Sequence, residues 1–127
     1  TGCEIAYELY LQGKHPTIVE MKDGVAKDAP YIHYKHLMTK LEESVKMFCS
    51  AKVKSIEADG VVIADADGNE RKLEADTVLI AAGMRATSEK YDAWLNLVED
   101  MVVVGDCRRT AKIQEAMRTG YCAGMTI

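Results

Sequence analysis

The sequence lacks three features that would indicate common functional classes. No apolar run approaches the roughly 20 residues that cross a bilayer, and the net charge of −4 offers nucleic acid no electrostatic attraction. We therefore expect neither a membrane nor nucleic acid as a partner. The four cysteines show neither a Cys-x-x-Cys pair nor the spacing of zinc ligands.

The cysteines are scattered, at Cys3, Cys49, Cys107 and Cys122. Cys3 and Cys122 fall among apolar residues of expected helices, where a free thiol behaves as a small hydrophobic side chain. We interpret all four as structural thiols in a reducing cytoplasm. The first residue is Thr1 rather than Met and no signal peptide is present, so we expect a processed or truncated start.

What is present is the composition of one soluble globular domain. The chain has 127 residues, of which 48% are apolar and 28% charged. That length is sufficient for a hydrophobic core, and the balance is not that of a disordered chain.

The first half of the chain alternates between helical and extended patterns. Apolar side chains at helical spacing predict a helix over residues 3–11, ended by Gly13. Its apolar side consists of Ile5 and Leu9, with Cys3, Ala6 and Tyr10 beside them. Residues 16–20 form a β-branched run typical of a buried parallel strand. After a polar loop over residues 21–30, a second amphipathic helix is indicated by Tyr34, Leu37, Met38, Leu41 and Val45.

In the second half of the chain, the pattern of apolar residues changes from helical spacing to that of strands. Strands are predicted at residues 46–50, 52–56, 61–64 and around 71–73, and two apolar strands at 78–83 and 101–106. The last helix carries its small and apolar residues on one side, where they suit close packing on a sheet: Ile113, Ala116, Met117, Gly120, Tyr121 and Gly124. The order of elements predicts an α/β fold that an antiparallel meander interrupts.

Two positions fit a dinucleotide-binding fingerprint. In such folds a glycine-rich turn lets backbone approach a pyrophosphate at a helix N-terminus, and Gly2 matches the third glycine of that turn. Glu20 closes the next strand 18 residues later, where a carboxylate accepts hydrogen bonds from the adenosine ribose. A carboxylate there repels a 2′-phosphate and favours NADH over NADPH, although Lys22 weakens this preference. The alternative is an ordinary carboxylate at a strand end.

Longer segments resemble a known family. Residues 2–9 and 17–21 are similar to the NADH-binding half of the pyridine nucleotide–disulfide oxidoreductase superfamily, in particular its group of 2,4-dienoyl-CoA reductase, 2-enoate reductase and NADH:flavin oxidoreductases. Residues 75–85 resemble the segment that closes the NAD domain. Residues 103–107, with a downstream helix, resemble the second FAD motif.

The resemblance implies a fold, a division of the chain and a set of roles. We predict a Rossmann-like α/β domain with an antiparallel β-meander over residues 46–73 and its first strand missing. Residues 1–100 would form the NAD(H)-binding domain, and residues 101–127 would return to the FAD-binding domain. The cofactor-binding residues would be Gly2 at the NADH pyrophosphate, Glu20 on the ribose, Gly83 beside the dinucleotide, and Gly105 and Asp106 at the FAD ribityl chain. Turn chemistry is the alternative for Gly105 and Asp106.

The implied function is the NADH-binding part of a flavin-dependent oxidoreductase, of the NADH oxidase or enoate and dienoyl reductase kind. Hydride would pass from NADH to flavin and electrons onward to the remaining domains, with FMN and an iron–sulfur cluster placed elsewhere in the parent enzyme. No residue stands out as a catalytic acid, base or nucleophile. We expect the chain alone to be inactive, to bind NADH weakly and not to retain FAD.

Two other functions compete with this one. A non-catalytic NAD(H)-responsive module would not need the FAD-type tail over residues 102–127. A dehydrogenase that acts directly from NAD on a substrate is disfavoured, because no Tyr/Lys or His/Asp constellation stands out.

One segment mimics the start of a calcium loop. Asp65, Asp67 and Asn69 alternate as such ligands do, but the glycine is misplaced at Gly68 and Asp76 stands where Glu is usual. A hairpin turn is the better prediction.

Three further signals have simple readings. His33 and His36 lie three residues apart without a third ligand, which is typical of a solvated helix face. Arg108 and Arg109 could meet a flavin pyrophosphate or be ordinary exposed arginines. Trp94, among apolar neighbours, is expected to be a packing anchor.

Overall fold

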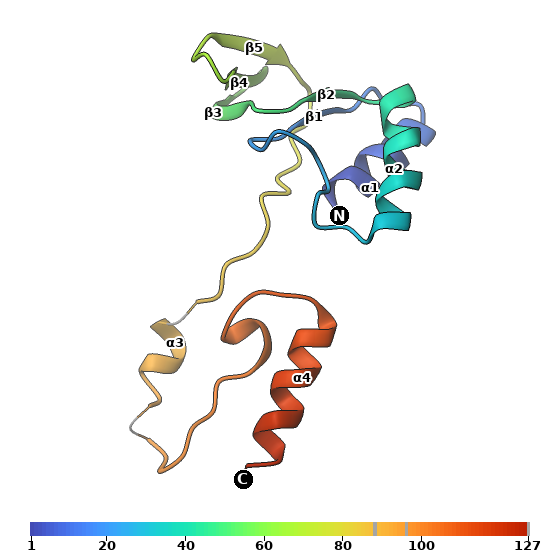
Figure 1. Ribbon diagram of the computed structural model, residues 1–127. Helices are drawn as coiled ribbons and strands as arrows, with labels where there is room; N and C mark the ends of the chain where they lie inside the picture. Colours follow the sequence, from blue (N-terminus) through green and yellow to red (C-terminus); the bar gives the residue numbers. More distant parts are fainter. Residues whose placement is uncertain (88, 96, 127) are drawn as a thin grey trace. The chain divides into compact units, whose positions relative to one another are not determined.

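The computed structural model describes residues 1–87, 89–95 and 97–126. The chain forms two compact units, Thr1–Ala81 and Ala82–Ile127, and each is described by itself (Figure 1). None of the described helices is both long and apolar enough to pass through a membrane.

The first unit begins with a helix, a strand, a helix and a strand. These are α1 (Gly2–Leu11), β1 (Thr17–Val19), α2 (Tyr31–Ser44) and β2 (Lys46–Phe48). β1 and β2 pair in parallel, with Ile18 opposite Met47. Parallel neighbours joined by a helix form the unit from which nucleotide-binding folds are built, so the α/β prediction is confirmed for this part.

The helices and the parallel pair share one core. Ala6 of α1 and Leu41 and Val45 at the end of α2 are buried, and further apolar side chains pack around them: Cys3, Tyr7, Ile18, Leu37, Met38 and Met47. The predicted inner face of α2 is thus confirmed. The predicted apolar side of α1 is confirmed at Cys3 and Ala6 and wrong at Ile5 and Tyr10, which are 42% and 41% exposed. Apolar residues occur on more than one side of α1, so its period alone did not decide which side turns inward.

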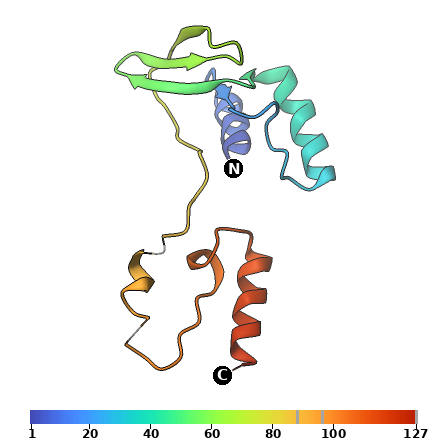
Figure 2. The ribbon, with the colours of Figure 1, turned by 60° about the vertical axis from the view of Figure 1, so that its left-hand side comes forward.

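An antiparallel meander completes the first unit (Figure 2). It consists of β3 (Lys52–Glu57), β4 (Gly60–Ala64) and β5 (Glu70–Glu74), with β4 in the middle. Ala51, Val61 and Ile63 are buried, and Val19, Phe48 and Leu73 pack against them. β2 pairs with β1 and not with the meander, so the prediction that the meander starts at residue 46 is wrong. The sequence of β2 fits either β1 or the meander as a neighbour, so only the observed pairing shows which sheet β2 joins.

The turn between β4 and β5 is organised by one carboxylate. Asp65 accepts hydrogen bonds from the backbone N–H of Asp67 (3.0 Å) and of Asn69 (2.9 Å), and from the Asn69 side chain (3.1 Å). Gly68 has φ of +85°, which glycine adopts without strain. The prediction of a hairpin turn is therefore confirmed.

The two predicted apolar strands at 78–83 and 101–106 are wrong for this structure. Both segments are irregular, apart from the 3-10 turn η1 (Gly105–Cys107). A strand needs a hydrogen-bonded neighbour, and no described residue pairs with either segment. Ile80 is accordingly 79% exposed.

The second unit contains the short helix α3 (Glu89–Asp92), η1 and the helix α4 (Ile113–Gly124). α4 packs on η1 through Thr119, its one buried residue among those described. The predicted apolar side of α4 is wrong, because Ile113, Met117 and Tyr121 are exposed. The prediction that Trp94 is a packing anchor is also wrong, because its side chain is 56% exposed. The described residues of the second unit form no sheet on which these side chains could pack.

Candidate functional site

Glu20 lies at the carboxyl end of β1, the edge of a parallel sheet where ligands bind. Its N–H donates to the carbonyl oxygen of Phe48 (2.8 Å), and its own carbonyl accepts from the N–H of Ala51 (3.0 Å). These two bonds extend the parallel pair by one residue and fix the backbone at Glu20. The half-buried side chain accepts a hydrogen bond at Oε1 from the N–H of Lys22 (2.9 Å).

The strand that ends before Glu20 packs against α1, with Ile18 of β1 in the core that includes Ala6. Burial raises the pKa of the Cys3 thiol, and the negative charge of Glu20 adds to this rise. Within the described part of the chain, no hydrogen bond or ion pair engages Oε2 of Glu20. A carboxylate with a free oxygen at the end of a strand that packs on this helix matches the adenosine end of a dinucleotide site.

Gly2 is the first residue of α1 and permits a close approach. A Cβ built on Gly2 would lie 2.9 Å from Cβ of Ala81, well inside the ~3.5–4.0 Å contact of two carbon atoms. The missing side chain lets the end of residues 78–81 lie against the start of the helix. Close helix–strand packing is the role of the third glycine of the dinucleotide fingerprint.

Gly83 belongs to the second unit. It has φ of +83°, and nothing lies within 4 Å of an added Cβ. Glycine is favoured there by backbone conformation rather than by space. Its predicted place beside a dinucleotide stays a prediction, as does the domain boundary at residue 100.

Gly105 and Asp106 form a tight turn in front of α4. Gly105 has φ of +59°, and its N–H donates to Oγ1 of Thr119 (2.9 Å). Asp106 accepts a hydrogen bond at Oδ1 from the N–H of Ala111 (3.2 Å). These bonds agree with the turn interpretation, and the side chain of Asp106 is exposed. The role at an FAD ribityl chain stays a prediction.

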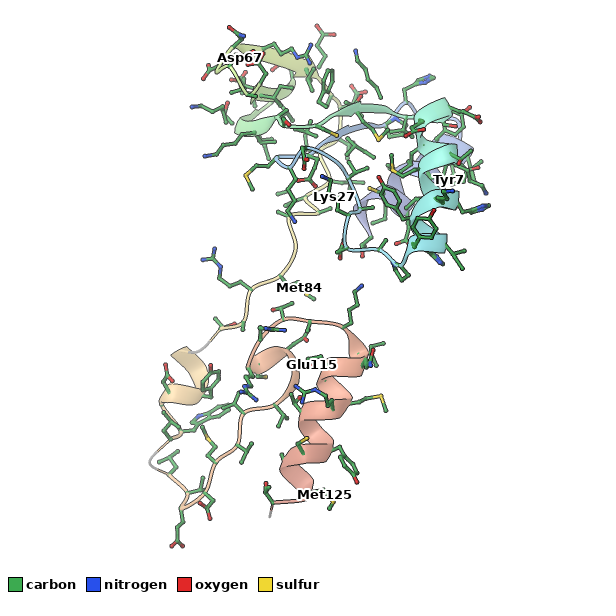
Figure 3. The ribbon with its side chains drawn as sticks, viewed as in Figure 1. Tyr7, Lys27, Asp67, Met84, Glu115 and Met125 are labelled. Atoms are coloured by element: carbon green, nitrogen blue, oxygen red, sulfur yellow. The ribbon has the colours of Figure 1, made fainter. Side chains whose placement is uncertain are left out.

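A polar hollow of about 440 Å³ lies between this turn and α4. Its lining residues come from η1, the loop after it and the first two turns of α4: Gly105, Arg108, Arg109, Glu115, Arg118 and Thr119. Figure 3 labels Glu115 on α4, beside the loop that holds η1. Arg118 was missed by sequence reasoning, although its i,i+3 spacing from Glu115 places the two on one helix face.

The other candidate residues do not assemble into a site. Cys49, Cys107 and Cys122 are exposed, so the interpretation as packed structural thiols holds for the half-buried Cys3 alone. His33 and His36 are exposed, as predicted for a solvated face. Among the described residues no three His, Cys, Asp or Glu side chains are placed to hold a metal ion.

Comparison with known proteins gives one family. The family model described as "Pyridine nucleotide-disulphide oxidoreductase" matches residues 1–123. A metal reductase of Desulforamulus reducens is 32% identical over 117 residues, which cover 91% of this chain and 17% of that protein. A cinnamate reductase of Clostridium sporogenes is 26% identical over 128 residues, covering 94% of this chain and 18% of that protein.

Two solved structures have the same fold. A 2-naphthoyl-CoA reductase in complex with 2-naphthoyl-CoA superposes with a TM-score of 0.79 at 29% identity, over 98% of this chain and 19% of that one. The 6-hydroxypseudooxynicotine amine oxidase of Pseudomonas geniculata gives 0.77 at 22% identity, over 97% and 20%. The chain therefore spans about a fifth of the length of each relative, and the Rossmann-like fold predicted from sequence is confirmed.

Proposed function

The chain belongs to the pyridine nucleotide-disulphide oxidoreductase family, and on that premise we propose that it is the NADH-binding part of a flavin-dependent oxidoreductase. In this proposal hydride passes from NADH to flavin. The chain spans less than a fifth of its curated relatives, so the activity belongs to a larger protein.

One observation carries the proposal, the neighbourhood of Glu20 and the start of α1. Glu20 follows the strand that packs on α1, and its Oε2 is not engaged by the described residues. Glu20 would accept hydrogen bonds from the ribose hydroxyls, while the N-terminus of α1 would receive the pyrophosphate. A 2′-phosphate would meet the carboxylate, which supports NADH rather than NADPH.

A flavin fits the second unit. Asp106 is exposed on a turn that Gly105 and Thr119 hold, and its carboxylate suits the hydroxyls of a ribityl chain. When bound, flavin supplies the hydride acceptor. The residues of this chain bind and orient the two dinucleotides, with Gly83 placed beside the NADH. FMN and an iron–sulfur cluster would belong to the rest of the larger enzyme.

The substrate lies outside this chain in our proposal. Relatives named for metal, cinnamate and 2-naphthoyl-CoA reduction agree with one redox unit that serves different substrate domains. NADH oxidase and enoate or dienoyl reductase activities both fit. We expect the 127-residue chain by itself to bind NADH weakly and not to retain FAD, and we place the larger protein in the cytoplasm.

The test is anaerobic mixing of the flavin-containing larger protein with NADH. Rapid loss of flavin absorbance near 450 nm, roughly stoichiometric with NADH, is expected for hydride transfer to a cofactor. NADPH at the same concentration serves as the control and should react more slowly. Binding of NADH without bleaching would refute the redox role and support an NAD(H)-responsive module instead.

A further inference from the structure

The hollow in the second unit has an excess of positive charge. We call it the arginine hollow and define it by Arg108, Arg109 and Arg118, which line it together with Gly105, Glu115 and Thr119. Three guanidinium groups face one carboxylate, so two positive charges are in excess.

The side chains of Glu115 and Arg118 form an ion pair. Nε of Arg118 donates to Oε2 of Glu115 (3.0 Å), and Nη2 donates to Oε1 (2.7 Å). The hydrogen bonds from Arg118 lower the pKa of Glu115 most, and the charges of Arg109 and Arg108 lower it further. The carboxylate is therefore neutralised by a partner on its own helix, and the other two arginines lie close by.

Backbone hydrogen bonds hold the turn that carries Arg108 and Arg109. Their N–H groups donate to the carbonyl oxygen of Gly105, at 3.0 and 3.2 Å. The positive φ of Gly105 and its hydrogen bond to Thr119 fix this turn against α4. No ion pair involves either guanidinium among the residues that the structure describes. The fold thus brings two arginines with a held backbone to one hollow, where none of the described residues supplies an anion to them.

We propose that the arginine hollow binds a phosphate or pyrophosphate group through Arg108 and Arg109. A doubly negative group matches the excess charge of the hollow. Guanidinium groups bind phosphate oxygens in pairs of parallel hydrogen bonds, which exposed lysines do not reproduce. The pyrophosphate of a flavin dinucleotide is the source that fits if the proposed function holds, and free phosphate is the other source.

The direct test is calorimetric titration of the 127-residue chain with inorganic pyrophosphate at low ionic strength. We expect one site, weakened at least tenfold in Arg108→Gln/Arg109→Gln and only partly in Arg108→Lys/Arg109→Lys. The matched control Lys14→Gln/Lys52→Gln removes the same charge from exposed positions and should bind within twofold of the unchanged chain. Absence of binding, or equal weakening in the glutamine variant and the control, would overturn the proposal.

Two further arms identify the source and separate this proposal from the proposed function. In the larger protein stripped of flavin, an Arg108→Gln/Arg109→Gln variant that binds FAD more weakly assigns the site to the dinucleotide. Unchanged FAD affinity together with arginine-dependent pyrophosphate binding assigns it to free phosphate. If NADH does not reduce the flavin, the proposed function fails while the pyrophosphate titration still decides on the hollow.

Discussion

Replacing Gly2 by alanine tests the packing that joins α1 to the end of the first unit. The added methyl would lie 2.9 Å from Cβ of Ala81, whereas two carbon atoms in contact stay ~3.5–4.0 Å apart. The segment at Ala81 must therefore move by roughly 0.6–1 Å. Overpacking of this kind costs about 1–3 kcal/mol, and the lower half of that range applies because residues 78–81 have no ladder to break.

The assay is urea unfolding followed by far-ultraviolet circular dichroism. With an m-value of about 2 kcal/mol/M, a loss of about 1 kcal/mol lowers the midpoint by about 0.5 M. Ala81→Gly removes the opposing methyl, so we expect Gly2→Ala/Ala81→Gly to recover most of that loss. The control is Gly120→Ala, where nothing lies within 4 Å and alanine should stabilise α4 by up to about 1 kcal/mol. Strictly additive effects of Gly2→Ala and Ala81→Gly would refute the contact.

Three further predictions concern the first unit. Gly60→Ala places a Cβ 2.2 Å from the carbonyl oxygen of Leu73, so β4 and β5 must separate locally, and we expect a loss above about 3 kcal/mol in the same urea assay. Leu41→Ala empties a fully buried position and should cost about 2–5 kcal/mol. Hydrogen bonding from Asn69 lowers the pKa of Asp65. The ionised Asp65 carboxylate therefore stabilises the folded chain above the ordinary carboxyl pKa of about 4, and this stabilisation is lost as the pH falls through the lowered pKa. Asp65→Asn should therefore be less stable at pH 7 and lose less stability on acidification, as urea midpoints at several pH values would show.

Local patterns predicted the first unit well. The spacing of Leu37, Leu41 and Val45 defined the buried side of α2, and the alternation of Asp65, Asp67 and Asn69 with glycine defined a turn. Both depend on contacts within a few residues, which sequence periodicity records directly. The carboxylate at Glu20 was predicted from its distance in sequence to Gly2, and the structure places it at the carboxyl end of β1.

Features that depend on distant partners were harder to predict. The apolar runs at residues 78–83 and 101–106 have strand composition, but a strand exists only where a neighbour pairs with it. The direction of the apolar sides of α1 and α4 also depends on what covers them, and exposed Ile5 and Ile113 show the error. Arg118 could be assigned to a site only once the fold placed it on the same hollow as Arg108 and Arg109.

The central claim is that Glu20 holds the adenosine ribose of NADH at the start of α1. The most direct measurement is the dissociation constant of NADH for the larger protein with Glu20 and with Glu20→Gln, with exposed Glu42→Gln as the control. Losing hydrogen bonds to a charged group costs about 1.5–3 kcal/mol, which predicts at least about tenfold weaker NADH binding and a gain in relative affinity for NADPH. Unchanged NADH affinity in Glu20→Gln, with Glu42→Gln also unchanged, would contradict the claim.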